Sequence, residues 1–324
     1  MKIALIGPGI MPIPPPGWGA VEILIWDYYN ELTKIGHDVT IINTKDLAEI
    51  VKTVNAGKFD FVHLHYDVYY VILHYLNCPR VAITSHYPYI DQIEKHRGDG
   101  YEKTFYFLLK QQQYYHFVLA DKDMQTFISH GANPQCLRKM KNGINSAAFR
   151  FDATAALDKT IYLGKISPRK NQAKYQDLEG IDFVGNNADP QFRVNRSNYL
   201  GEWSRTRIHD ELTKYTNLLL LSEGEADPLV VKEALIAGLG VVVNQSSAEN
   251  LDLSKNFITI IEDNKMNDLN YVKMKIEENK EISRSKRQEI HDYGVRQFDI
   301  SVEVKNYLES LILESLALES LVLE

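Results

Sequence analysis

Two glutamates eight residues apart, Glu225 and Glu233, stand on either side of a predicted helix start in SEGEADPLVVKEALIAGLGVVVN, residues 222–244. Asp227 and Pro228 predict that start, because aspartate caps free N–H groups and proline is favoured at the first helical position. The N-terminus of a helix attracts phosphate. The stretch therefore predicts a phosphate site with a carboxylate on each side for hydroxyl groups. The alternative is solvent exposure, but the residues around Glu233 are too apolar for a freely exposed helix.

Three cations follow a predicted strand that ends at Gly164. The stretch YLGKISPRKNQ carries Lys165, Arg169 and Lys170 in a short loop. Cations at the carboxyl end of a strand suit a diphosphate. A loop that is merely solvated is the alternative that this stretch alone leaves open.

The loop after the first predicted strand, GPGIMPIPPPGWGAVE at 7–22, is rich in glycine and proline. Its first Gly-x-Gly pair resembles a dinucleotide fingerprint, but Pro12 stands where that fingerprint needs glycine. No acidic residue ends the second strand either, so the loop does not predict nicotinamide binding. Gly17 and Gly19 lie directly before a helix, where backbone N–H groups can approach an anion or a sugar. A proline-stiffened connector is the alternative.

Short apolar runs alternate with helical spacing along most of the chain, which predicts parallel sheets covered on both faces. Strands are predicted at 2–7, 37–43, 59–65, 80–86, 116–120, 160–164, 181–185, 198–201, 217–222, 240–244 and 257–261, with a helix at 20–36 and further helices from about 268. The pattern breaks at a turn-rich segment near 142–156.

The predicted fold class is α/β, with two doubly wound, Rossmann-like parallel-sheet domains facing a cleft and helices at the C-terminus. The predicted ranges are 1–145 for the first domain, 146–295 for the second, and 296–324 for a C-terminal helix with a low-complexity tail. Ligands of such sheets bind at the carboxyl ends of the strands. The tail repeats Leu-Glu-Ser-Leu-x, and five residues do not return to one helical face. It predicts an extension without chemistry, with a partner helix or a membrane contact as the alternative.

The composition of the 324 residues restricts the kinds of molecule that the protein is expected to bind. The net charge of −7 argues against a nucleic-acid binder, whose binding face is usually basic. Cys78 and Cys136 have no metal-ligand spacing and suggest no disulfide framework, so both are predicted to be reduced thiols. No run approaches the roughly 20 apolar residues that span a bilayer, and the N-terminus does not read as a signal peptide. We therefore expect a cytoplasmic protein without metal or nucleic acid.

From residue 1 to about 307 the chain resembles the retaining glycosyltransferases of the GT-B fold, family 4. The resemblance includes the glutamate pair E-x7-E at Glu225 and Glu233, the Gly-Lys…Lys clamp, and the glycine loop. The other matching stretches are EALIAGLGVVV (233–243), KNGIN (141–145) with Phe149, GHDV (36–39), FDFVHLH (59–65) and TSH (84–86). Each motif alone is moderately specific, and together they occur in the family's order.

The resemblance implies a role for each matching residue. Lys165 and Lys170 would hold the donor diphosphate and stabilise charge on the departing nucleoside diphosphate. Glu225 would contact the hydroxyls of the donor sugar, and Glu233 those of the ribose. His86 would line the sugar site. The remaining donor-binding residues would be Gly17, Gly19, Gly164, Gly201, Glu202, Pro228 and Leu229.

No metal or cofactor is implied, because the lysines and the helix dipole take the place of a cation. For His86, a buried and hydrogen-bonded histidine is the alternative, and His63 and His65 are predicted to be structural. The family usually has E-G-F-G-L where this chain has EADPL, residues 225–229. Pro228 has no N–H to offer a ligand. These departures leave the identity of the donor sugar open.

The sequence thus predicts a metal-independent hexosyltransferase that moves a hexose, with retention, from a UDP- or GDP-linked donor to a hydroxyl acceptor. A growing glycan is the preferred acceptor, recognised by residues 87–113, and a membrane partner is not indicated. The alternatives are a non-catalytic nucleotide-sugar-binding protein of the same fold and a sugar-nucleotide epimerase. The glutamate spacing and the hinge at 141–149 speak against the epimerase. The donor nucleotide, the linkage and the oligomeric state stay open.

Overall fold

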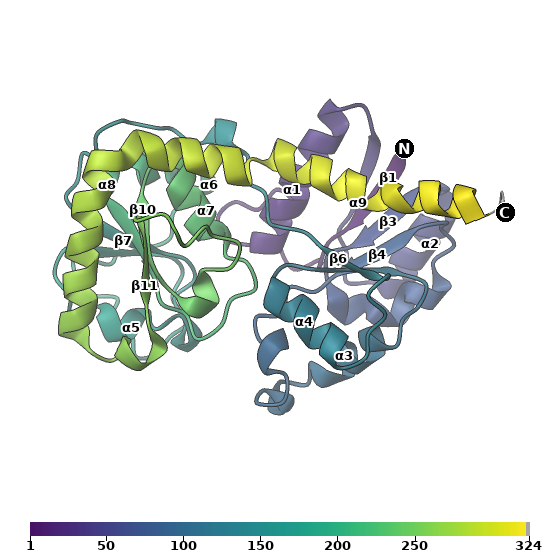
Figure 1. Ribbon diagram of the computed structural model, residues 1–324, viewed down its shortest axis with the longest axis horizontal. Helices are drawn as coiled ribbons and strands as arrows, with labels where there is room; N and C mark the ends of the chain where they lie inside the picture. The colour runs from purple at the N-terminus through teal and green to yellow at the C-terminus, as the bar shows by residue number, and fades with distance from the viewer. Residues whose placement is uncertain (322–324) are drawn as a thin grey trace. The chain divides into compact units, whose positions relative to one another are not determined.

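The computed structural model describes residues 1–321, with side chains described up to Leu311 (Figure 1). The chain forms two compact units. The first unit comprises Met1–Pro14, Val21–Gly143 and the chain from Ile300 onward, and the second comprises Pro15–Ala20 and Ile144–Asp299. The glycine-rich segment Pro15–Ala20 is therefore packed with the second unit. The predicted domain ranges 1–145, 146–295 and 296–324 stay predictions.

The first unit contains a six-stranded sheet in the order β2-β1-β3-β4-β5-β6, and all of its strand pairs are parallel. Its strands are β1 (Lys2–Ile6), β2 (Asp38–Ile42), β3 (Phe61–Leu64), β4 (Val81–Thr84), β5 (Tyr115–Val118) and β6 (Leu137–Lys139), and its helices are α1 (Ala20–Lys34), α2 (Leu47–Gly57), α3 (Glu102–Leu109), α4 (Asp121–Ser129) and α9 (Ile300–Leu321). The sequence did not predict β6, because Leu-Arg-Lys is too short and too polar to show a strand pattern.

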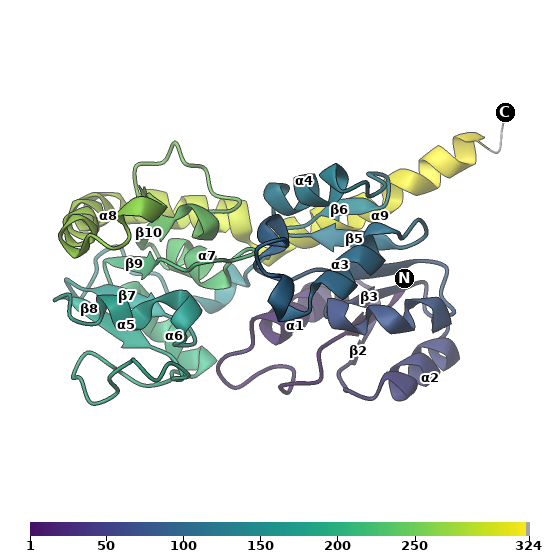
Figure 2. The ribbon, with the colours of Figure 1, turned by 90° about the horizontal axis from the view of Figure 1, so that it is seen from below.

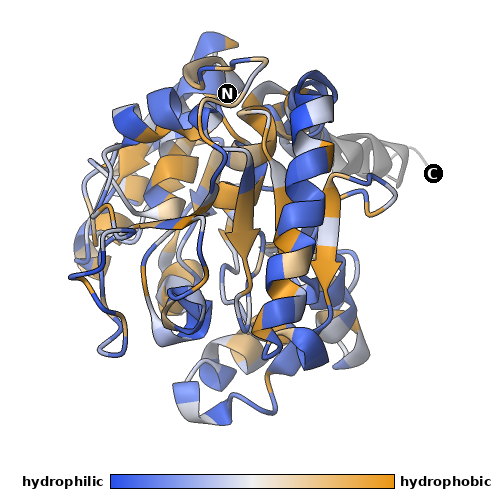
Figure 3. Ribbon diagram, turned by 90° about the vertical axis from the view of Figure 1, so that its left-hand side faces the viewer, coloured by the Kyte–Doolittle hydropathy of each residue, from blue (hydrophilic) through white to orange (hydrophobic). Residues whose placement is uncertain are grey.

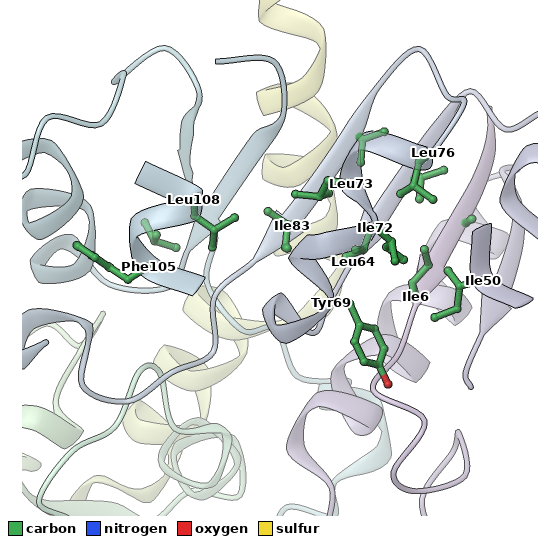
Figure 4. Close-up of a cluster of buried hydrophobic side chains, with 14 of the residues drawn as sticks. Ile6, Ile50, Leu64, Tyr69, Ile72, Leu73, Leu76, Ile83, Phe105 and Leu108 are labelled. Carbon is green, nitrogen blue, oxygen red and sulfur yellow. The ribbon is translucent and has the colours of Figure 1, made fainter. Parts of the chain in front are cut away.

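The central strands β3 and β4 are buried along their whole length, as expected of parallel strands covered on both faces. Side chains from strands and helices form one apolar core on this sheet (Figure 4). The hydroxyl of Tyr69, at the edge of that core, donates to the carbonyl of Pro8 at 2.8 Å. On another part of the unit, α9 runs past β5 and β6 (Figure 2), where the ring of Tyr307 lies 5.5 Å from that of Phe117. The last long helix is thus part of the first unit.

The second unit contains a five-stranded parallel sheet in the order β11-β10-β9-β7-β8. Its strands are β7 (Thr160–Leu163), β8 (Ile181–Val184), β9 (Asn217–Leu220), β10 (Gly240–Asn244) and β11 (Ile258–Ile261), and its helices are α5 (Gln172–Tyr175), α6 (Arg205–Glu211), α7 (Leu229–Ile236) and α8 (Leu269–Phe298). The strands are strongly apolar, as Figure 3 shows in orange. The predicted class, α/β with two doubly wound parallel sheets and C-terminal helices, is confirmed.

The strand predicted at 198–201 is wrong. The segment forms a single isolated bridge, between Phe183 and Tyr199, and no strand of its own. Gly201 has a φ of +72°, in the left-handed region that glycine favours, and its carbonyl still accepts from the N–H of Gly185. The segment therefore runs beside the end of β8 without forming a strand of its own.

Within residues 1–321, no helix combines the length and the apolar character that crossing a membrane needs.

Candidate functional site

The cationic loop predicted from the sequence starts where β7 ends. Gly164 follows the strand with a φ of +140°, a backbone conformation that residues other than glycine rarely adopt. The backbone of β8 also comes close here, since a Cβ built on Gly185 would lie 1.9 Å from the carbonyl oxygen of Gly164. Lys165 follows directly, and Pro168–Lys170 forms a 3-10 turn that carries the other two cations. The tight exit from β7 thus places three cations within seven residues of the strand end.

Glu225 contacts two of these three cations. Its Oε1 is 2.9 Å from Nζ of Lys170 and 3.1 Å from Nη1 of Arg169. Burial by itself raises the pKa of Glu225, but the charges of Lys170 and Arg169 outweigh it, so the pKa is lowered. Glu225 is therefore ionised, and the two cations that contact it leave an excess of positive charge.

Arg169 also fastens the loop before α7 to the cationic loop. Its carbonyl accepts a hydrogen bond from the N–H of Glu223 at 2.9 Å, and its guanidinium donates to the carbonyl of Gly224. The sequence placed Arg169 in the cationic loop but assigned it no role. Its contacts depend on a segment more than fifty residues away, which the sequence pattern does not show.

The start of α7 differs from the prediction. The helix begins at Leu229, and Pro228 occupies the N-cap position without a capping hydrogen bond, so Pro228 is not the first helical residue. Asp227 is paired with a side chain further along the helix. Its Oδ2 lies 2.5 Å from Nζ of Lys232, and both side chains are buried. The prediction failed because Lys232 is buried and needs a counterion, which Asp227 provides.

Glu233 lies on α7 and is also paired. Its Oε1 is 2.8 Å from Nη2 of Arg205, the first residue of α6. Both side chains are largely buried. Arg205 further contacts Nε2 of His209 at 3.2 Å. Sequence reasoning missed Arg205, and no local signal marks it, because the contact joins two helices.

The glycine-rich segment Pro15–Ala20 contacts the rest of the second unit in three places. The N–H of Arg205 donates to the carbonyl of Pro16 at 3.3 Å. A Cβ on Gly17 would lie 2.7 Å from Oε1 of Glu202, so only glycine fits there without a shift. The ammonium of Lys165 lies 5.3 Å from the centre of the Trp18 ring. The second unit therefore brings Gly17, Glu202 and Lys165 together.

The other predicted donor-binding residues also lie in this unit. Gly19 has a φ of +122° and Gly201 one of +72°, so both adopt backbone conformations that favour glycine. The carbonyl of Gly201 accepts a hydrogen bond from the N–H of Gly185 at 2.9 Å. Leu229 is buried at the start of α7. Their roles toward a ligand stay predictions.

His86 belongs to the first unit, two residues after β4. Its Nε2 is buried and has no hydrogen-bond partner among the described residues, unlike the satisfied histidine weighed as the alternative. Burial lowers the pKa of His86 to about 4, so the ring is neutral near pH 7. The neighbouring His63 is fully paired, at 2.8 Å from the Tyr307 hydroxyl and 2.6 Å from the Thr84 hydroxyl. His86 is thus a neutral ring whose buried Nε2 has no hydrogen-bond partner among the described residues.

The chain matches no family model, and no curated protein matches it in sequence. Solved structures do match. Sucrose-phosphate synthase from Thermosynechococcus elongatus is 14% identical and has a TM-score of 0.75, with 97% of this chain and 100% of that one covered.

HepE of Anabaena, solved with UDP-glucose, is 16% identical with a TM-score of 0.70 and coverage of 96% and 100%. WaaG, a glycosyltransferase involved in lipopolysaccharide biosynthesis, is 12% identical with a TM-score of 0.66 and coverage of 94% and 98%. At these identities the likeness establishes the fold. The chain therefore has the two-domain, Rossmann-like GT-B fold that these glycosyltransferases share.

Proposed function

We propose that the protein is a glycosyltransferase that moves a sugar from a nucleoside diphosphate sugar to a hydroxyl group of an acceptor. The observation that carries this proposal is the pair of cations, Arg169 and Lys170, that contact the ionised Glu225 shortly before the start of α7, with Lys165 in the same loop. A diphosphate carries the complementary charge, and a helix N-terminus adds N–H groups and a favourable dipole. The GT-B fold and the UDP-glucose bound by HepE support this proposal.

Each charged residue has a distinct task in the proposed reaction. Lys165, Arg169 and Lys170 hold the diphosphate and offset the negative charge that grows on it as the bond to the sugar breaks. Glu225 accepts hydrogen bonds from hydroxyls of the sugar, and Glu233 from those of the ribose.

The remaining roles follow the family resemblance. We propose that His86 accepts a hydrogen bond from the donor sugar through its neutral Nε2, since this nitrogen has no partner among the described residues. We also propose that Gly17, Gly19, Gly164, Gly201, Glu202, Pro228 and Leu229 line the donor. The hexose, the retention of configuration, a glycan acceptor and a cytoplasmic location belong to the same proposal.

Donor binding is tested by thermal unfolding with UDP, GDP, ADP, CDP and their common sugar conjugates. A ligand at 100 times its dissociation constant adds about 2.7 kcal/mol to the free energy of unfolding, so one nucleotide class is expected to raise Tm clearly. The protein with the responding donor is then given sugar acceptors and assayed for transfer. Absence of a shift with every nucleotide would contradict the proposal.

The Lys170→Ala variant tests the cationic cluster. It removes one preorganised charge, so kcat is expected to fall roughly 10²–10³-fold while the protein stays folded. Lys174→Ala is the matched control, because Lys174 is exposed on α5 and donates to Asn267 instead of Glu225. Turnover by Lys170→Ala at the wild-type rate would exclude the role given to Lys170.

A non-catalytic nucleotide-sugar-binding protein is the second candidate. The altered loop at 225–229 favours it, because Pro228 has no N–H and Asp227 is committed to Lys232. It predicts a thermal shift with a donor but neither transfer nor donor hydrolysis. Turnover with any acceptor excludes it.

A further inference from the structure

We propose that Trp18 is a positioning residue that holds the ammonium of Lys165 ready for the donor diphosphate. This inference rests on the proposed function and adds a residue that the cationic motif does not contain. Trp18 lies in the segment Pro15–Ala20, which is packed with the second unit.

The three cations of the loop after β7 differ in what they contact. Arg169 and Lys170 are both paired with Glu225. The ammonium of Lys165 forms no ion pair with a carboxylate of the described residues, and it lies 5.3 Å from the centre of the Trp18 ring. A cation over the face of an indole is attracted by the negative face of the ring. Lys165 is therefore held by a group that carries no net charge.

The backbone next to Trp18 is held in place by its neighbours. The carbonyl of Pro16 accepts from the N–H of Arg205, and Gly17 lies against Glu202, so the backbone on the N-terminal side of Trp18 is fixed to the second unit. Trp18 is nevertheless 38% exposed. Part of this residue therefore faces solvent, where a ligand bound by Lys165 could contact it.

This arrangement suits an anion that arrives and leaves in each catalytic cycle. A carboxylate partner would have to be displaced before Lys165 could take up a phosphate, which would weaken binding. The indole restricts the lysine without neutralising it, so its positive charge stays available. When a bound donor excludes water, the contact between the ring and the ammonium also becomes stronger.

Three variants test the role of the ring. Trp18→Phe keeps an aromatic face, and Trp18→Leu keeps apolar bulk without one. Calorimetric titration with the nucleoside diphosphate that stabilises the wild type is expected to give about two- to fivefold weaker binding for Trp18→Leu, the range of a partly exposed cation–π contact. Trp18→Phe is expected to lie near the wild type. In a Lys165→Ala background, Trp18→Leu is expected to have no further effect, because the partner of the ring is gone.

Fluorescence gives an independent measurement, since the chain has three tryptophans: Trp18, Trp26 and Trp203. Trp203 is buried and Trp26 lies on α1, stacked on Tyr29. Adding the same nucleotide is expected to change the emission of the wild type, and this change is expected to disappear in Trp18→Phe.

Equal affinity of Trp18→Leu and wild type would overturn the inference, as would an undiminished effect of Trp18→Leu in the Lys165→Ala background. Both results leave the proposed function standing, because the wild type still binds its nucleotide. If the wild type binds none of the nucleotides, the proposed function fails and this inference fails with it. Melting curves of each variant without ligand show whether it is folded.

Discussion

At the scale of single residues, the second unit contains a buried ion pair between Asp227 and Lys232. Its Oδ2 and Nζ atoms are 2.5 Å apart, and the two side chains are 0% and 1% exposed. Lys232 also lies 5.2 Å from the centre of the Phe298 ring. Removing one member of such a pair leaves the other charge buried, which costs more than the pair itself contributes. The pair therefore fixes the start of α7, where the donor is proposed to bind.

We expect Lys232→Met to lower the free energy of unfolding by about 3–5 kcal/mol, because the carboxylate of Asp227 stays buried without its counterion. Urea unfolding measures the loss. The double variant Asp227→Asn/Lys232→Met carries neither charge and is expected to recover most of the stability. A single variant as stable as the wild type would contradict this account of the pair.

Asp67 gives the first unit a dependence on pH. Burial raises its pKa from 3.8 to about 6, although the hydroxyl of Tyr101 donates to it at 2.5 Å. The folded state therefore favours the protonated form. The protonated Asp67 stabilises the folded state fully below about pH 4, and this stabilisation is lost as the pH rises through 6.

We expect the wild type to lose on the order of 3 kcal/mol relative to Asp67→Asn between pH 4 and pH 7, since asparagine does not titrate. Urea unfolding at several pH values measures the difference in free energy of unfolding between the two proteins. The variant can differ from the wild type by a constant amount, so the slope of the difference is the test. A difference that does not change across this pH range would show that the pKa of the Asp67 carboxyl is not raised.

At the scale of elements, a polar contact of Tyr307 inside an apolar packing surface helps to hold α9 on the sheet of the first unit. The Tyr307 hydroxyl lies 2.8 Å from Nδ1 of His63, and the two rings are stacked with centroids 5.5 Å apart. His63 belongs to β3, and its other nitrogen contacts Thr84 of β4. The last helix thus completes a hydrogen-bond chain that reaches two strands.

We expect Tyr307→Phe to lower the free energy of unfolding by about 1–3 kcal/mol, because Nδ1 of His63 is left buried without a partner. Tyr106→Phe is a matched control, since Tyr106 is exposed and bonds only to Glu94 in an exposed contact. The control is expected to change stability by less than about 0.5 kcal/mol. Equal losses from the two variants would show that the His63 contact does not fasten α9.

At the scale of the whole molecule, we propose that the protein supplies the charge for the reaction without a metal ion. The cations around Glu225 are expected to stabilise the leaving diphosphate in the way that a divalent ion does in other transferases. We expect the rate of sugar transfer to be the same in excess EDTA as in Mg²⁺ or Mn²⁺. A rate that falls in EDTA and returns with added metal would refute metal independence.

The sequence by itself determined the elements that depend on local pattern. Apolar runs predicted β7, β9 and β10, and the helix start predicted from Asp227 and Pro228 placed Glu225 before and Glu233 inside α7. These features could be predicted because strand and helix periodicity are properties of neighbouring residues. The three-residue β6 carried too little pattern to be predicted.

The tertiary structure decided which charged groups meet. It paired Asp227 with Lys232 instead of the helix end, gave Glu233 the partner Arg205, and put Trp18 against Lys165. The partners of Glu233 and of Lys165 come from other segments of the chain. The pairing of Asp227 with Lys232 depends on how deeply the lysine is buried. Burial sets the cost of an unpaired charge, and only the folded chain determines burial.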